Sequence, residues 1–447
     1  MAQTDKKLNI LIQCSLRLIS LVISGLVFFS SSARAMTLIY DEETEKYLQE
    51  IIAPLYHAVG LSYDRHKVFV LQDNSLNAFV SDGNNLFIHT ETILKAQTDD
   101  ELRGIIAHEA GHIQGGHILR QKLRLHEMQN ISLTSMVLAG ALGVASGRGD
   151  VAAAIALGTH SSLLNQSLAY QVQEERNADE AAVSILNKTH HSPYGLLKVM
   201  KKIQQQSKLQ GIDETVYFRT HPMSSERLAF LEQSVKKSPY PPQTSGSEKL
   251  KRIQAKLYAF IKSPQQTNLK YPASDDSLIS CYARSIAAFK NFQFNKAKTL
   301  VDRLITQEPN NPHFRELKGQ ILYELGQLQS AQKEFSYAIK LSPNSDLFKI
   351  NEAQVVLELS PTPIQLRNVI IRLQQALRTR QSTMGWLLLS RAYHLNKQEA
   401  EALYASAQYS LSVGNKELAY KQAQKAKALS LDPKLTLKIE DLMRLIQ

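Results

Sequence analysis

The sequence predicts an α+β fold, mainly helical, in which a compact unit with a small β hairpin is followed by an all-helical array of repeats. Two short apolar segments flank the polar, glycine-bearing stretch 81–85, as the strands of a hairpin flank their turn. In the second half of the chain, a short motif recurs after 34 residues. Between the halves, 236–249 is rich in proline, serine and glycine, the composition of a linker.

The chain has 447 residues, too many for one ordinary domain. Its N-terminus has a basic lead, an apolar run at 18–29 and the small-residue sequence Ala33-Arg34-Ala35, the pattern of a secretory signal peptide cleaved after Ala35. The alternative is a retained signal anchor, although a membrane span needs about 20 apolar residues. The predicted parts are a signal peptide (1–35), a first domain (36–235), a linker (236–249) and a repeat domain (250–447).

Composition excludes some functions. The chain is basic, with a formal net charge of +11, but no block of Arg and Lys is interleaved with aromatic residues, so we expect no nucleic-acid binding. Peripheral contact with an anionic membrane surface stays open. Cys14 leaves with the signal peptide, so Cys281 can form neither an intramolecular disulfide nor a cysteine zinc site. We expect Cys281 to be buried and inert.

The first domain is expected to combine a few strands with helices. Acidic residues at 99–101 favour a helix start there, because negative charge interacts well with the N-terminal end of a helix. The expected elements are a helix over 41–59, a strand over 67–71, hairpin strands over 78–80 and 86–88, and helices over 92–96 and 99–119.

Residues 131–158 are apolar and rich in Gly and Ala, and 147–150 interrupts them. Each apolar half is too short to span a membrane. We expect a helical hairpin packed against the neighbouring helices, since small residues let helices approach closely. A mobile lid or a surface that touches a membrane is the alternative.

The second half carries the repeat. The sequence EPNN at 308–311 recurs as SPNS at 342–345, a step of 34 residues, which is the length of a tetratricopeptide repeat. The pattern W-x-x-L-x-x-x-Y at 386–393 fits the first helix of another repeat, whereas 346–384 carries no comparable pattern. Stacked helix pairs of this kind leave a concave groove that binds protein segments.

The stretch IIAHEAGHIQGGH, 105–117, contains His108, Glu109 and His112 in the pattern H-E-x-x-H. Residues four apart lie on one face of a helix, so both imidazoles can reach one metal ion while Glu109 takes a proton from water. Gly111 costs helix stability, which indicates close approach of another group. The alternative is a pair of structural histidines on an ordinary helix.

A catalytic zinc needs a third protein ligand. Glu175 and Asp179 lie four apart in the stretch QEERNAD, 173–179, so Glu175 can bind the metal while Asp179 accepts a hydrogen bond from a ligand histidine. On spacing alone Glu174 is an equal rival, and a solvated acidic helix face is the structural alternative.

The pair HEAGH at 108–112 and ERNAD at 175–179 resembles the HtpX/BepA group of gluzincin metallopeptidases, to which the CAAX prenyl protease also belongs. The resemblance implies a gluzincin-type zinc endopeptidase with one Zn²⁺ per chain. It implies His108, His112 and Glu175 as metal ligands, which favours Glu175 over Glu174. Glu109 is then the catalytic base, and Asp179 supports the site.

Further motifs extend the resemblance. It covers the sequence NAF at 77–79 and the sequence RTHP at 219–222, which is followed by Arg227. It implies that His221 approaches the zinc, either assisting catalysis or blocking the site, and that Arg227 pairs with a cleft carboxylate. An extended substrate would add to a strand edge at 86–89 by backbone hydrogen bonds. The implied substrate-binding residues are Asn77, Phe79, Leu86, Phe87, Ile88 and Arg227.

Other histidines lack such support. We expect His89, His117, His160 and the pair 190–191 to be structural or exposed.

A soluble peptidase followed by tetratricopeptide repeats is the arrangement of the BepA-like members, which implies a periplasmic protease for quality control of outer-membrane proteins. Its implied substrates are unfolded or misassembled envelope proteins, and the repeats would hold these clients or the outer-membrane assembly machinery. One alternative is a chaperone or scaffold whose peptidase site is mostly closed. Another, a membrane-embedded prenyl protease, requires further membrane spans.

Overall fold

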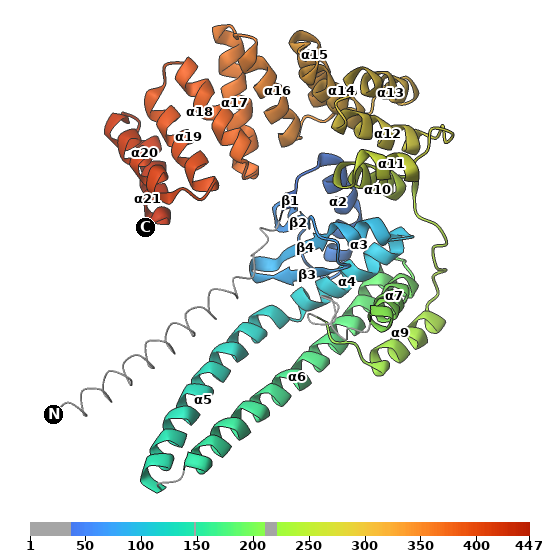
Figure 1. Ribbon diagram of the computed structural model, residues 1–447, viewed down its shortest axis with the longest axis vertical. Helices are drawn as coiled ribbons and strands as arrows, with labels where there is room; N and C mark the ends of the chain where they lie inside the picture. The colour runs from blue at the N-terminus through green and yellow to red at the C-terminus, as the bar shows by residue number, and fades with distance from the viewer. Residues whose placement is uncertain (1–36, 147–148, 211–220) are drawn as a thin grey trace, which may run out of the picture. The chain divides into compact units, whose positions relative to one another are not determined.

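The computed structural model describes residues 37–146, 149–210 and 221–447, so the expected signal peptide lies outside the described residues. The chain is mainly helical with one small sheet, which confirms the predicted fold class (Figure 1). Among the described residues, no helix is both long and apolar enough to cross a membrane.

The sheet has four strands in the order β1-β2-β4-β3. Strand β3 pairs antiparallel with β4, with Phe79 opposite Phe87, and this confirms the predicted hairpin. Strand β2 runs parallel to β4 on its other side. The strands are β1 Leu38–Ile39, β2 Val68–Leu71, β3 Ala78–Ser81 and β4 Asn85–His89.

Strand β3, not β4, lies at the edge of this sheet. The prediction that 86–89 offers a free edge is wrong, because β2 occupies the second side of β4. Side chains of β4 alternate between the two faces. Leu86 and Ile88 are buried in the core, whereas Phe87 stacks against both Phe69 and Phe79 on the opposite face.

Helix α4 packs against α2, α6 and α7. It ends at Gln114, so the prediction of one helix over 99–119 is wrong. The break follows from Gly116, whose φ of +65° is a left-handed conformation that favours glycine. The helices described up to residue 237 are α2 Glu42–His57, α3 Thr90–Lys95, α4 Asp99–Gln114, α5 His117–Ser146, α6 Gly149–Lys188, α7 Tyr194–Gln210 and α9 Ser225–Lys237, with the short helices η1 Arg65–Lys67 and η2 Asp82–Asn84.

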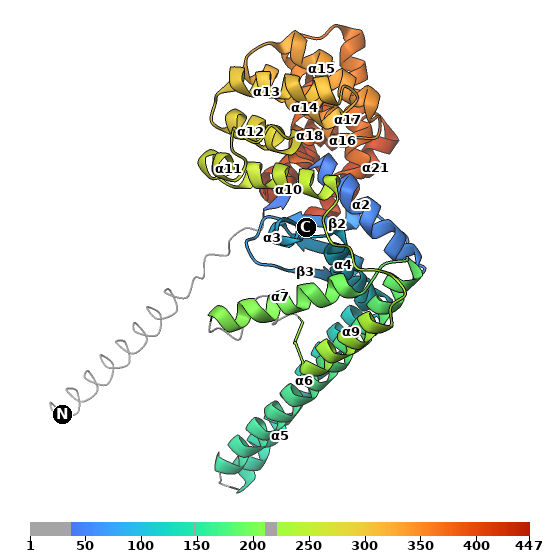
Figure 2. The same cartoon turned by 90° about the vertical axis from the view of Figure 1, so that its right-hand side faces the viewer.

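Helices α5 and α6 form the hairpin expected over 131–158, and residues 147–148 between them lie outside the described residues. The two helices pack side by side and extend together away from α4, so the far part of the hairpin does not pack against α4 (Figures 1 and 2). Ile131 and Leu133 on α5 are exposed.

The second half of the chain is a series of helix pairs. Helices α12, α14 and α16 begin at Leu278, Pro312 and Asp346, so successive starts are 34 residues apart. Residues 346–384, which carry no clear repeat pattern, contain the whole of the next pair, α16 and α17. The helices are α10 Glu248–Ile261, α11 Pro264–Lys270, α12 Leu278–Lys290, α13 Phe294–Gln307, α14 Pro312–Glu324, α15 Leu328–Leu341, α16 Asp346–Glu358, α17 Pro363–Thr379, α18 Thr383–Leu395, α19 Glu399–Ser412, α20 Lys416–Leu429 and α21 Pro433–Ile446.

Helix α10 contributes to two hydrophobic cores. Leu250, Ile253 and Leu257 join the core formed around helices α2, α4 and α7. Ala255 and Ala259 join the core of the first repeat helices. Through α10, the helices around α4 and the first repeat helices therefore share apolar packing.

Gly104 on α4 faces the backbone of α7, and an added Cβ would lie 2.5 Å from the amide nitrogen of Leu196. We predict that Gly104→Ala lowers the free energy of unfolding by about 1–3 kcal/mol, because the two helices must separate. Urea denaturation measures this change. The exposed variant Gln114→Ala on the same helix should stay within about 0.5 kcal/mol of the parent. Equal stability of Gly104→Ala and the parent would contradict the close packing.

Candidate active site

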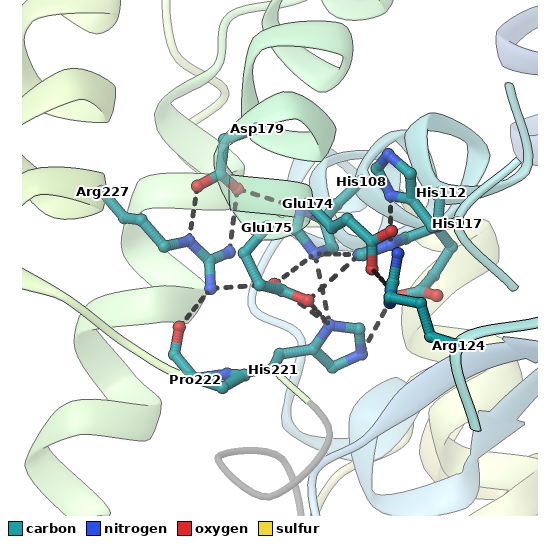
Figure 3. A network of polar contacts seen from close by, with 11 residues as sticks. His108, His112, His117, Arg124, Glu174, Glu175, Asp179, His221, Pro222 and Arg227 are labelled. Atoms are coloured by element: carbon teal, nitrogen blue, oxygen red, sulfur yellow. Dashed lines mark hydrogen bonds and ion pairs between the residues drawn. The ribbon is translucent and has the colours of Figure 1, made fainter. Parts of the chain in front are cut away.

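Helix α4 carries His108, Glu109 and His112, and the imidazoles of His108 and His112 lie toward Glu175 of helix α6 (Figure 3). All three side chains are buried. The two helices meet at Gly111, where an added Cβ would lie 2.8 Å from the carbonyl oxygen of Ala178. This confirms the expected close approach of another group at Gly111.

The helix contact brings a carboxylate to the two imidazoles. Nε2 of His108 lies 3.1 Å from Nε2 of His112 and 3.2 Å from Oε2 of Glu175. Nε2 of His112 lies 3.3 Å from Oε1 of Glu175. In a tetrahedral zinc site with bonds of about 2.0–2.1 Å, neighbouring donor atoms are about 3.3 Å apart. These three residues therefore fit a metal ion such as zinc.

Asp179 supports His108 from behind. Its Oδ1 lies 2.9 Å from Nδ1 of His108, and Arg227 donates to its two oxygens at 2.6 and 3.0 Å. Burial disfavours a charged His108, but hydrogen bonds to Asp179 and Glu175 outweigh this effect and raise the pKa of His108 to about 10. Asp179 thus orients the ring so that Nε2 faces Glu175.

The neighbouring carboxylates Glu174 and Glu175 turn to different partners. Nη1 of Arg227 lies 2.9 Å from Oε2 of Glu175. Burial opposes a charged Glu175, yet the positive charge and hydrogen bonds of the neighbouring histidines hold its pKa well below the usual range. Glu174 instead lies 2.7 Å from Arg124 and 3.5 Å from Arg120. Of the two, Glu175 lies among the histidines.

His221 completes the group of donors. Its Nδ1 lies 3.1 Å from Oε1 of Glu175 and 3.4 Å from Nε2 of His108. Its Nε2 lies 3.4 Å from Oε1 of Glu109. The candidate donor atoms of His108, His112, Glu175 and His221 all lie within 4.8 Å of one another, so His221 is a possible fourth ligand. These four residues are called the donor group. Arg219 and Thr220 of the same motif lie outside the described residues.

Glu109 borders a cavity of about 230 Å³ beside this group. Phe79 and Val80 of the edge strand β3 line the same cavity, as do His112 and Glu175. Burial raises the pKa of the Glu109 carboxyl, which makes it a better proton acceptor than an exposed glutamate. The cavity therefore joins a basic carboxylate, the donor group and a strand edge.

The remaining predicted substrate residues take different places. Asn77 is buried, and its backbone N–H donates to a threonine of α3 at 2.9 Å. Leu86 and Ile88 lie in the core, whereas Phe87 packs behind Phe79 with ring centroids 5.0 Å apart. Of these side chains, that of Phe79 lines the cavity.

His117 has a contact that the sequence did not predict. It is buried, and its Nδ1 lies 2.8 Å from Nδ1 of His112. The signal that could have found it is the glycine pair 115–116, which ends α4 directly before His117 and allows the chain to fold back.

Residues 42–235 match the sequence profile of peptidase family M48. The chain contains a family M48 peptidase domain. It is a metalloendopeptidase, as the H-E-x-x-H pattern predicts.

Similar proteins agree with this assignment. The chain is 21% identical to the beta-barrel assembly-enhancing protease of Escherichia coli O157:H7 over 84% of this chain and 77% of that protein. It is 22% identical to the protein of the same name from Yersinia pestis, over 68% of this chain and 63%, less than two thirds, of the relative. The metalloprotease LoiP of Escherichia coli K12 is 25% identical over 43% of this chain and 70% of that protein.

We predict that Asp179→Asn lowers metal affinity by about 10- to 100-fold, because the amide presents a donor to a site already filled with N–H donors. Competition with a chelator of known affinity measures the change. The exposed neighbour Glu180 supplies a control, and Glu180→Gln should bind metal like the parent. Unchanged affinity in Asp179→Asn would contradict the orienting role of Asp179.

Proposed function

We propose that this chain is a zinc endopeptidase in which His108, His112 and Glu175 hold the ion. The observation that carries the proposal is the mutual separation of their donor atoms, 3.1–3.3 Å, which suits a tetrahedral site. A bound zinc ion would supply a Lewis acid that lowers the pKa of water to about 7. Glu109 and the residues around it supply the remaining chemistry.

Glu109 acts as the general base. It is buried beside the donor group, and its raised pKa suits a carboxylate that accepts a proton from the attacking water and passes it to the leaving amine. Asp179 and Arg227 act through other residues: Asp179 holds His108, and Arg227 bridges Asp179 and Glu175.

The edge strand β3 receives the substrate. An extended peptide pairs with the backbone of β3 beside Asn77 and Phe79, so that its scissile bond enters the cavity next to Glu109. The central strand β4 supports this edge through its ladder with β3, including Leu86, Phe87 and Ile88. These residues thus bind substrate indirectly, by holding β3 in place.

His221 closes the site in the form described here. A catalytic zinc keeps one position open for water or substrate. Nδ1 of His221 lies 3.1 Å from Oε1 of Glu175 and 3.4 Å from Nε2 of His108, close enough that it would fill that position if the ion were held by these residues. The His221 side chain therefore blocks the reaction until it turns away from this position. The same contact favours a second candidate function, a chaperone or scaffold with a mostly closed peptidase site.

The chain acts in the periplasm, after its signal peptide has been cleaved after Ala35. Two relatives are named beta-barrel assembly-enhancing proteases, which supports a role in quality control of outer-membrane proteins. The substrates are unfolded or misassembled envelope proteins, and the groove of the repeats docks these clients or the outer-membrane assembly machinery. Peripheral membrane contact fits this role, and nucleic acid has no part in it.

We predict that Glu109→Gln retains about one zinc per chain and loses casein cleavage by about 100-fold or more, because the metal ligands remain and the general base is lost. Zinc content by atomic emission and cleavage on the same preparation measure both effects. Parallel loss of zinc and activity in Glu109→Gln would instead make Glu109 a part of the metal site. A parent without zinc would contradict the proposed function.

We predict that His221→Ala raises the rate of casein cleavage by about 10-fold or more. An alternative, open state of the site holds about 0.1–10% of the parent molecules, and removal of the His221 side chain makes it the main state. Initial rates on casein measure the change, with His190→Ala as a control at an exposed histidine. A decrease would show that His221 assists catalysis. Zinc binding with no cleavage in the parent or in His221→Ala would favour the scaffold.

A further inference from the structure

The turn between α4 and α5 folds His117 back onto the last turn of α4. The N–H of Gly115 donates to the carbonyl of Gly111 at 2.8 Å, and the N–H of Gly116 donates to the carbonyl of Ile113 at 3.0 Å. Gly116 then takes its left-handed conformation, and α5 begins at His117. The first residue of α5 therefore faces the helix that precedes it.

The ring of His117 lies directly against Gly115. A Cβ at position 115 would lie 2.3 Å from Nε2 of His117, closer than any real contact, and the three atoms nearest to it all belong to this ring. The backbone of Gly115 has φ −69° and ψ −13°, which any residue adopts. A side chain at 115 is thus excluded by the imidazole and not by backbone strain.

The contact uses the nitrogen of His112 that faces away from the donor group. Nδ1 of His112 lies 2.8 Å from Nδ1 of His117, and the two rings are nearly perpendicular, at 81°. Nε2 of the same ring faces His108 and Glu175. Both imidazoles are buried, so water does not compete freely for this contact.

The two ligand histidines have the same arrangement with different partners. Nδ1 of His108 faces the carboxylate of Asp179 at 2.9 Å, while Nδ1 of His112 faces a second imidazole. A histidine that binds a metal through Nε2 carries its proton on Nδ1, and that N–H needs an acceptor. Nδ1 of His117 can accept this N–H only when it carries no proton itself. The proton of a neutral His117 is therefore on Nε2.

We propose that His117 is a positioning residue for the metal site: it accepts the N–H of His112 and holds the ring with Nε2 toward the metal. This inference rests on the proposed function, since it assigns the partner of a proposed ligand. A neutral imidazole is a weaker acceptor than a carboxylate. His112 is therefore the less strongly polarised ligand, and its orientation depends on the turn at 115–117.

The test uses the full chain with zinc as the probe and three variants. His117→Phe keeps a ring but removes the acceptor. His117→Gln keeps an acceptor oxygen. Gly115→Ala leaves both imidazoles in the sequence and displaces the ring of His117. Leu119→Ala, two residues along α5 and exposed, is the matched control.

We predict that His117→Phe and Gly115→Ala bind zinc about 10-fold or more weakly in competition with a chromophoric chelator, the range seen when an outer partner of a ligand is lost. His117→Gln should recover most of the affinity, and Leu119→Ala should equal the parent. The visible spectrum of the cobalt-substituted chain should shift in the two weakened variants, because the ligand geometry changes. A purely structural His117 would lower the melting temperature of the metal-free chain without these changes.

Zinc affinities of His117→Phe and Gly115→Ala within about twofold of the parent would overturn this inference and leave the proposed function intact. A parent that binds no zinc would overturn both. If His117→Phe does not fold, Gly115→Ala decides the matter, because its backbone conformation suits alanine.

Discussion

The site depends on the close approach of α4 and α6 at Gly111. Because this glycine has no side chain, the backbone of α6 at Ala178 reaches α4. Glu175 lies almost one helical turn before Ala178, and Asp179 directly follows it, so one helix contact delivers both carboxylates to His108. Neither helix carries the site alone: α4 provides nitrogen donors and a base, and α6 provides the oxygen donor and the outer acceptor.

Burial makes this group of charges interdependent. Removing a charged group from water costs free energy unless partners compensate it. Here Arg227 pairs with Asp179 and Glu175, and those carboxylates face the histidines of the donor group. Each member of the network is therefore both a functional group and the electrostatic partner of another, so single substitutions are expected to be non-additive.

Local patterns predicted much of the fold, because they depend on residues close in sequence. The hairpin at 78–89, the 34-residue step of the repeats and the spacing of HEAGH and ERNAD all follow from such patterns. Local patterns did not predict that β4 is a central strand, because strand order depends on pairing with β2, which lies far from the hairpin turn. The contact of His117 was also missed, because two glycines reverse the chain and the helical spacing no longer applies.

The measurement that tests the account most directly is zinc-edge anomalous diffraction from crystals of the full chain. We predict one zinc peak bounded by Nε2 of His108, Nε2 of His112 and the carboxylate of Glu175, with Nδ1 of His221 as the fourth neighbour. A peak elsewhere, or none, would contradict the metal site. A zinc at these three ligands with His221 turned away would contradict the closed state.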